Sequence, residues 1–138
     1  MSLLSVAQIL SARDLKTHDE PVPEWPNEDG TPGILRFRKL SAGESIRMSE
    51  ITGARPDDSL YVIIAMSLDG DNGQRLFEMK TDEDVQRAID VLSSKDMTVL
   101  NRLQHVAFAV NKVRVPTPEQ PELPNASGEA PSGASPSN

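Results

Sequence analysis

Leu60-Tyr-Val-Ile-Ile-Ala-Met-Ser-Leu68 is the longest apolar run in the chain, and eight of its nine residues are apolar. Such a run has no polar face to offer to water, so we expect it to be buried on most sides. Pro56-Asp-Asp58 precedes it, and a proline followed by acidic residues suits the first turn of a helix. We therefore predict a buried helix from about Pro56 to Leu68, around which the rest of the chain is organised.

A β-strand is the alternative for this run. Val62, Ile63 and Ile64 are β-branched, which favours extended structure. The segment Asp69–Gly73 could then turn the chain into a second strand over Gln74–Met79. We favour the helix because the residues before the run fit the start of a helix better than the start of a strand.

Two more helices are predicted after the run. Thr81–Asp84 has the composition of a helix N-terminus, with a threonine cap followed by three acidic residues. Apolar residues then recur at the spacing of one helix face up to Leu92, and a further stripe continues to about Lys112. The two stripes are Val85, Ala88, Ile89 and Leu92, then Met97, Leu100, Leu103, Ala107 and Val110.

The segment before these helices has the pattern of a β-hairpin. The three prolines near Val22 suit an edge strand between Leu15 and Trp25, because proline cannot donate to a ladder. Asn27–Gly33 concentrates turn-forming residues, and Ile34–Leu40 alternates apolar with basic side chains. We predict two antiparallel strands joined by a long loop.

Two short helices flank the predicted hairpin. Apolar residues at helical spacing favour one over residues 3–10. Ser41 and Glu44 form a capping box that begins the other, and Thr52-Gly53 is expected to end it after Ile51.

The predicted fold is mainly α, a small helical bundle preceded by a β-hairpin (α+β). Four segments make up the chain: a short N-terminal helix or arm over residues 1–12, the extended segment and hairpin over 13–40, the helical bundle over 41–112, and a tail over 113–138. The tail is rich in Pro, Gly and Ser, and we expect it to be disordered because it has too little apolar surface to offset the entropy of ordering. The predicted core includes Leu60, Ile63, Ile64, Phe77, Ile89 and Leu103.

Composition restricts the classes of function. The chain of 138 residues has a net charge of -7 and no cysteine. A strongly acidic chain repels phosphates, so we expect no nucleic-acid partner, and no apolar segment is long enough for a membrane span. His105 has no Asp, Glu or His four residues away on its helix, and His18 lies in an acidic extended segment, where a solvated charge is the expected state. There is no nucleophile elbow or phosphate-binding loop. We predict a non-enzymatic protein without catalytic, cofactor-binding or metal-binding residues.

The order of short motifs along the chain resembles the tail assembly chaperones of long-tailed bacteriophages and prophages. These motifs are Ile9-Leu-Ser-Ala-Arg-Asp-Leu15, Pro23-Glu-Trp25, Leu35-Arg-Phe-Arg38, Leu40-Ser-Ala-Gly-Glu44, Arg75-Leu-Phe77 and Leu103-Gln-His-Val-Ala-Phe-Ala-Val-Asn111, together with the apolar run. The sequence departs from the pattern in the long loop Pro26–Gly33 and around Ile51–Arg55, where more helix is expected.

The resemblance implies a non-enzymatic chaperone that binds the tape measure protein and promotes tail tube assembly. Its implied partners are the tape measure protein and the major tail tube protein, with self-association as a further expectation. The implied location is the host cytoplasm, and the protein is expected to be absent from the finished virion. A generic acidic helical adaptor or regulatory protein-binding domain is the alternative.

A chaperone of this kind would bind its client through apolar helix positions that the hairpin leaves uncovered. Val99 and Phe108 lie off the predicted stripe that begins at Met97, so we expect them on the outer side of the last helix. The candidate client contacts are Met97, Val99 and Phe108. Arg36 and Arg38 are candidate flanking contacts. Packing of the apolar positions against the hairpin is the equal alternative.

Overall fold

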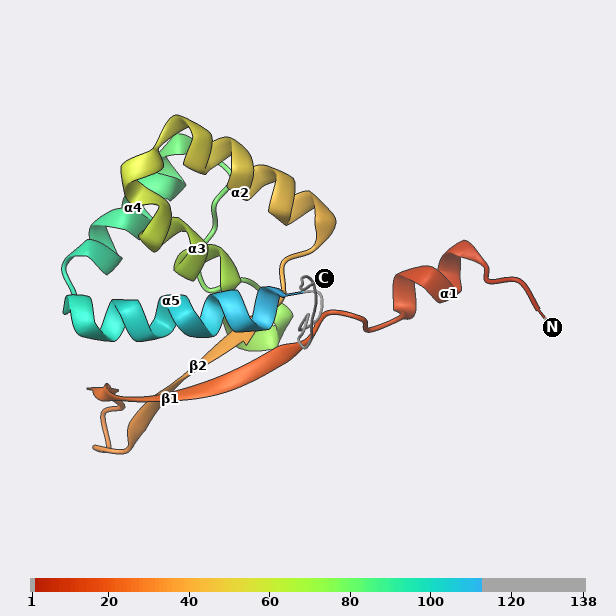
Figure 1. Ribbon diagram of the computed structural model, residues 1–138. Helices are drawn as coiled ribbons and strands as arrows, with labels where there is room; N and C mark the ends of the chain where they lie inside the picture. The colour runs from red at the N-terminus through yellow and green to blue at the C-terminus, as the bar shows by residue number, and fades with distance from the viewer. Residues whose placement is uncertain (1, 113–138) are drawn as a thin grey trace, which may run out of the picture.

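The apolar run forms the central helix of the molecule. Helix α3 (Ser59–Ser67) begins directly after a 3-10 turn, η1 (Pro56–Asp58), and all of its residues from Val62 to Ser67 are buried. It packs against α2, α4 and α5, whose ribbons surround it in Figure 1. The predicted helix is confirmed, and the strand alternative is wrong for Leu60–Ser67. Leu68–Asp69 nevertheless form the short strand β3, and an antiparallel bridge joins Asp69 to Arg75 after the turn.

The computed structural model describes residues 2–112, so the predicted disorder of residues 113–138 lies outside the described part of the chain. A mainly α fold with a preceding hairpin is confirmed for the described residues. The other elements are α1 (Val6–Ser11), β1 (Thr17–Pro26), β2 (Pro32–Arg38), α2 (Ala42–Ala54), the 3-10 turn η2 (Asp71–Gly73), α4 (Asp82–Ser93) and α5 (Met97–Asn111).

The hairpin belongs to a three-stranded antiparallel sheet with the order β1-β2-β3. Thr17 lies opposite Arg38 and Glu20 opposite Leu35, while Phe37 of β2 also pairs with Leu68 of β3. One face of this sheet is covered by α5 (Figure 1). The third strand was not predicted, because two residues at the end of a helix are too short to produce an alternating pattern.

Proline protects the free edge of the sheet. The Lys39 N–H donates to the Lys16 carbonyl oxygen at 2.8 Å, so in this register the even-numbered residues of β1 bond to β2 and the odd-numbered ones face outward. Pro21 therefore costs the ladder no bond, and it removes a donor from the edge where another strand could attach.

Helix α2 is longer than its sequence predicts. Its capping box is present as expected, because the Glu44 N–H donates to Ser41 Oγ and the Ser41 N–H donates to the Glu44 carboxylate. Thr52-Gly53, however, lies inside the helix, and the predicted end after Ile51 is wrong. Pro56 stops the helix instead, because a residue before proline is driven out of the α region, and Arg55 has φ -134° and ψ 66°.

The core is aliphatic and confirms most of the predicted buried residues. Ile63, Ile64, Ile89 and Leu103 are all buried. Leu60 and Phe77, also predicted in the core, are only partly buried and pack against its edge. Leu60 lies in the first turn of α3 at the rim of the bundle, and Phe77 lies in the segment before α4, where it lines an open cleft.

Truncating the buried aromatic residue of the sheet tests this core. Phe37 has no exposed surface, so Phe37→Ala removes the full side chain from a closed site and should lower the free energy of unfolding by about 3–5 kcal/mol. Phe108 is half exposed, and Phe108→Ala should cost less than about 1 kcal/mol. Urea denaturation measures both variants, and equal losses would contradict the described packing.

Candidate partner-binding surface

Helix α5 has an outer face on which two large apolar side chains are exposed and which has no acidic residue. Asp96 begins the helix by accepting from the Thr98 and Val99 N–H groups. Met97 and Phe108 are 51% and 50% exposed, and a separation of eleven residues, close to three turns, sets them on one side of the helix. Asn101 and Gln104 lie between them at the same helical spacing. We call these four residues the α5 stripe.

The α5 stripe differs from the rest of this acidic chain. Helix α5 contains no Asp or Glu, and its only lysine or arginine, Arg102, is already paired, while His105 is exposed. The Arg102 guanidinium donates to Glu24 at 2.8 and 2.9 Å, and these bonds lower the pKa of the Glu24 carboxyl to about 2. An apolar helical segment could therefore lie along the stripe without burying an unpaired charge.

Val99 does not belong to this surface. It is 4% exposed and lies in the core, so its predicted position on the outer side of the helix is wrong. The physical reason is that α5 is covered from two directions, by α3 and by strands β1 and β2. The buried part of the α5 surface is therefore wider than the single apolar stripe predicted from the sequence, and it includes Val99.

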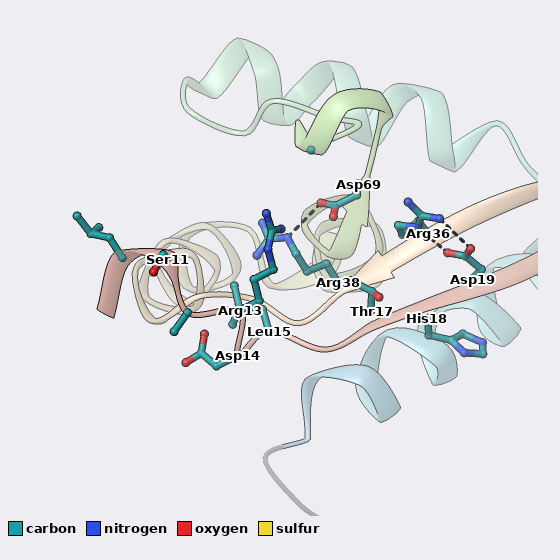
Figure 2. Close-up of a pocket in the computed structure, with 13 residues that line it drawn as sticks. Ser11, Arg13, Asp14, Leu15, Thr17, His18, Asp19, Arg36, Arg38 and Asp69 are labelled. Carbon is teal, nitrogen blue, oxygen red and sulfur yellow. Dashed lines mark hydrogen bonds and ion pairs between the residues drawn. The ribbon is translucent and has the colours of Figure 1, made fainter. Parts of the chain in front are cut away.

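The two arginines of β2 differ in their surroundings (Figure 2). Arg36 donates to both carboxylate oxygens of Asp19, at 2.7 and 2.9 Å, on the open face of the sheet, and this pairing lowers the pKa of Asp19. Arg38 is 20% exposed and bonds to Asp69 and Glu44. Arg36 stays accessible for a flanking contact, whereas the guanidinium of Arg38 is engaged inside the protein. Whether either binds a partner stays a prediction.

Arg38 is part of a partly buried network of four charges. Arg75 donates to Glu44 at 2.9 Å and to Asp69 at 2.9 Å, and Arg38 donates to the same two acids. Burial disfavours the charged form of Glu44, but the Ser41 N–H, Arg75 and Arg38 outweigh it and lower its pKa to about 2. Each charge in the network has an opposite charge beside it, as burial requires.

A polar groove lies between the sheet and the segment that joins α1 to β1. It has a volume of about 1040 Å³ and includes Arg13, Arg36 and Arg38 in its lining, with Asp19 and Asp69 beside the last two (Figure 2). These two pairs leave little unsatisfied charge for a ligand. Within residues 2–112, no group of three or more His, Cys, Asp or Glu side chains is arranged to hold a metal ion.

Helix α1 and the residues before it are an apolar feature that the predicted site did not include. Figure 1 shows α1 extending away from the body, and none of its residues is buried. The exposed apolar side chains of α1 and of the residues before it are Leu3, Leu4, Val6, Ile9 and Leu10, which range from 60% to 92% exposed. The sequence does contain a signal for this surface, because five large apolar residues and no charged residue lie between Ser2 and Ala12.

The fold is similar to that of the tail assembly chaperone of bacteriophage HK97. The two proteins share 20% sequence identity with a TM-score of 0.51, over 80% of this chain and 96% of the HK97 chaperone. No family model matches the chain, and no curated protein matches its sequence. The resemblance predicted from the order of motifs is thus confirmed at the level of the fold. No helix among the described residues has the length and apolar character needed to cross a membrane.

Removing the negative charge of Glu44 tests the network. Its pKa is lowered in the folded state, so its contribution to stability is present above the unfolded value near 4.5 and is lost as the pH falls toward 2. Glu44→Gln should lower the free energy of unfolding by about 1–3 kcal/mol at pH 7, and the deficit should narrow below pH 4.5. Urea denaturation from pH 7 to pH 3 measures this difference.

Glu83→Gln is the matched control for this prediction. Glu83 lies in the first turn of α4 and is exposed, so its loss should have a small effect at every pH. A deficit for Glu44→Gln that stays constant between pH 7 and pH 3 would show that its ionisation is not coupled to folding.

Proposed function

We propose that the protein is a phage tail assembly chaperone without enzymatic activity. The observation that carries this proposal is the likeness to the HK97 tail assembly chaperone, which extends over 96% of that protein. The motif order along the chain independently points to the same family. A prophage origin is equally compatible with the proposal.

The client that this surface fits best is the tape measure protein, a long helical chain with exposed apolar surface. The α5 stripe supports this part of the proposal, because Met97 and Phe108 offer apolar area and the stripe has no acidic residue. The net charge of -7 lies elsewhere on the chain and would keep the complex soluble. Arg36 lies on the open face of the sheet, opposite the face that α5 covers, so it would make a separate contact with an acidic residue of the client.

Further contacts are part of the same proposal. The exposed apolar residues of α1 support a second protein contact, which we assign to self-association or to the major tail tube protein. The protein would act in the host cytoplasm and leave before the virion is complete. A generic acidic adaptor is the alternative, and binding of a tape measure segment distinguishes the two.

Co-expression with a tape measure fragment tests the proposal. The wild-type chain should hold the fragment in the soluble fraction and co-purify with it. Phe108→Asp replaces one of the two large apolar side chains of the stripe with a charge and should reduce recovery of the fragment at least tenfold, which corresponds to about 1.4 kcal/mol. The measurement is the ratio of fragment to chaperone after affinity purification.

Ile46→Asp is the matched control for this experiment. Ile46 is also exposed, at 64%, but lies on α2, so its replacement should leave recovery unchanged. Circular dichroism should show both variants folded. If the wild-type chain neither binds nor solubilises the fragment, the chaperone function is wrong; if both variants lose binding equally, the α5 stripe is not the client surface.

A further inference from the structure

The second side of strand β2 has an open edge. This strand pairs with β1 along most of its length, but with β3 only at Arg36 and Phe37. The ladder stops there because the Gly70 N–H donates to the Gln74 carbonyl oxygen at 2.6 Å and the chain turns away through η2. The position next to Ile34, where β3 would have to continue, is therefore not filled by a strand in the described part of the chain.

Ile34 directs both of its backbone polar groups toward this edge. In the antiparallel register Gly33 and Leu35 bond to β1, so the N–H and C=O of the residue between them point to the other side. Neither group hydrogen-bonds to any other of the described residues. An unpaired strand edge can receive a further strand, which β1 avoids at its outer edge through Pro21. Pro32 lacks an N–H in the same way, so the open part of β2 suits only a short segment.

A groove of about 320 Å³ lies beside this edge, and we call it the edge groove. Its lining includes Ile34, Leu35, Gly70 and Leu76. Ile34 and Leu76 are 57% and 47% exposed, so two large apolar side chains lie beside the free backbone groups. This combination matches an extended peptide, which offers backbone donors and acceptors together with side chains on alternate sides. A helical segment does not match it, because the backbone groups of a helix are bonded to one another.

The charge of the edge groove favours a basic occupant. Its lining contains one arginine, Arg36, and three acidic residues, Asp19, Asp69 and Asp71. Asp19 is paired with Arg36 (Figure 2), and Asp69 is paired with two other arginines. Asp71, in η2, has no salt bridge to any residue in the described part of the chain. One negative charge is thus left uncompensated in the groove, and it would attract a lysine or arginine of the occupant.

We propose that the edge groove binds an extended segment of a partner protein, which adds to the sheet beside Ile34 and in line with β3. The segment has an apolar residue opposite Ile34 and a basic residue close to Asp71. Directly opposite residues point to the same face of a sheet, so the apolar residue would pack against Ile34 and Leu76. The contact does not depend on the proposed chaperone function. It is separate from the α5 stripe, so the molecule can hold a helical and an extended segment at the same time.

Titration of the full-length protein with a model peptide tests this proposal. The probe is an acetylated and amidated pentapeptide with a central valine, a threonine on either side of it and a lysine at each end. In ¹⁵N NMR spectra the peptide should shift the Ile34 amide signal and slow its hydrogen exchange, which in the free protein should be faster than that of Leu35. Methylation of the valine backbone nitrogen removes the N–H that would donate to Ile34, and it should weaken binding about tenfold.

A charge variant tests the acidic end of the edge groove. Asp71→Asn should weaken binding of the peptide about threefold at low salt, and the difference should vanish at about 1 M salt. Asp57→Asn, at an exposed position in η1, is the matched control and should leave the affinity unchanged. An Ile34 signal that does not move with the peptide would overturn the proposal, as would equal binding of the methylated peptide. Slow exchange of the Ile34 amide that depends on protein concentration without peptide would show a second copy as the occupant and would also overturn it.

Discussion

The carboxylate of Glu44 joins the sheet to the helices. It closes the capping box of α2 and accepts from Arg38 of β2 and from Arg75, which follows η2. Both arginines also pair with Asp69 of β3, so one set of four charges links segments that are far apart in the sequence. Removal of any one member would leave two like charges sharing a single opposite charge in a partly buried site, which constrains all four residues together.

The division between charged and uncharged surface follows from this packing. Acidic residues are concentrated at β1, in the turns and at the start of α4, whereas α5 has none. Two sides of α5 are covered by α3 and by the sheet, and the remaining side exposes Met97 and Phe108. The molecule therefore exposes two large apolar side chains on α5, while its acidic residues are concentrated elsewhere.

Local signals predicted most of the fold. The apolar run, the capping boxes at Ser41 and Thr81 and the two apolar stripes lie at their expected positions, because each depends on residues within one or two turns. The predicted end of α2 at Thr52-Gly53 is wrong because a glycine is tolerated inside a helix, whereas Pro56 forces the residue before it out of the helical conformation. Of the candidate contacts, Phe108 is exposed and Val99 is buried, while Met97 is exposed although it was predicted within the inner stripe.

The sequence by itself determined which segments are helical and that a hairpin precedes them, since side-chain periodicity and cap chemistry are local properties. Only the tertiary structure decided the rest. The burial of Val99 depends on a second layer that covers α5, and the third strand exists because β2 offers an edge to Leu68 and Asp69. The Glu44 network likewise depends on distances between elements, which no local pattern encodes.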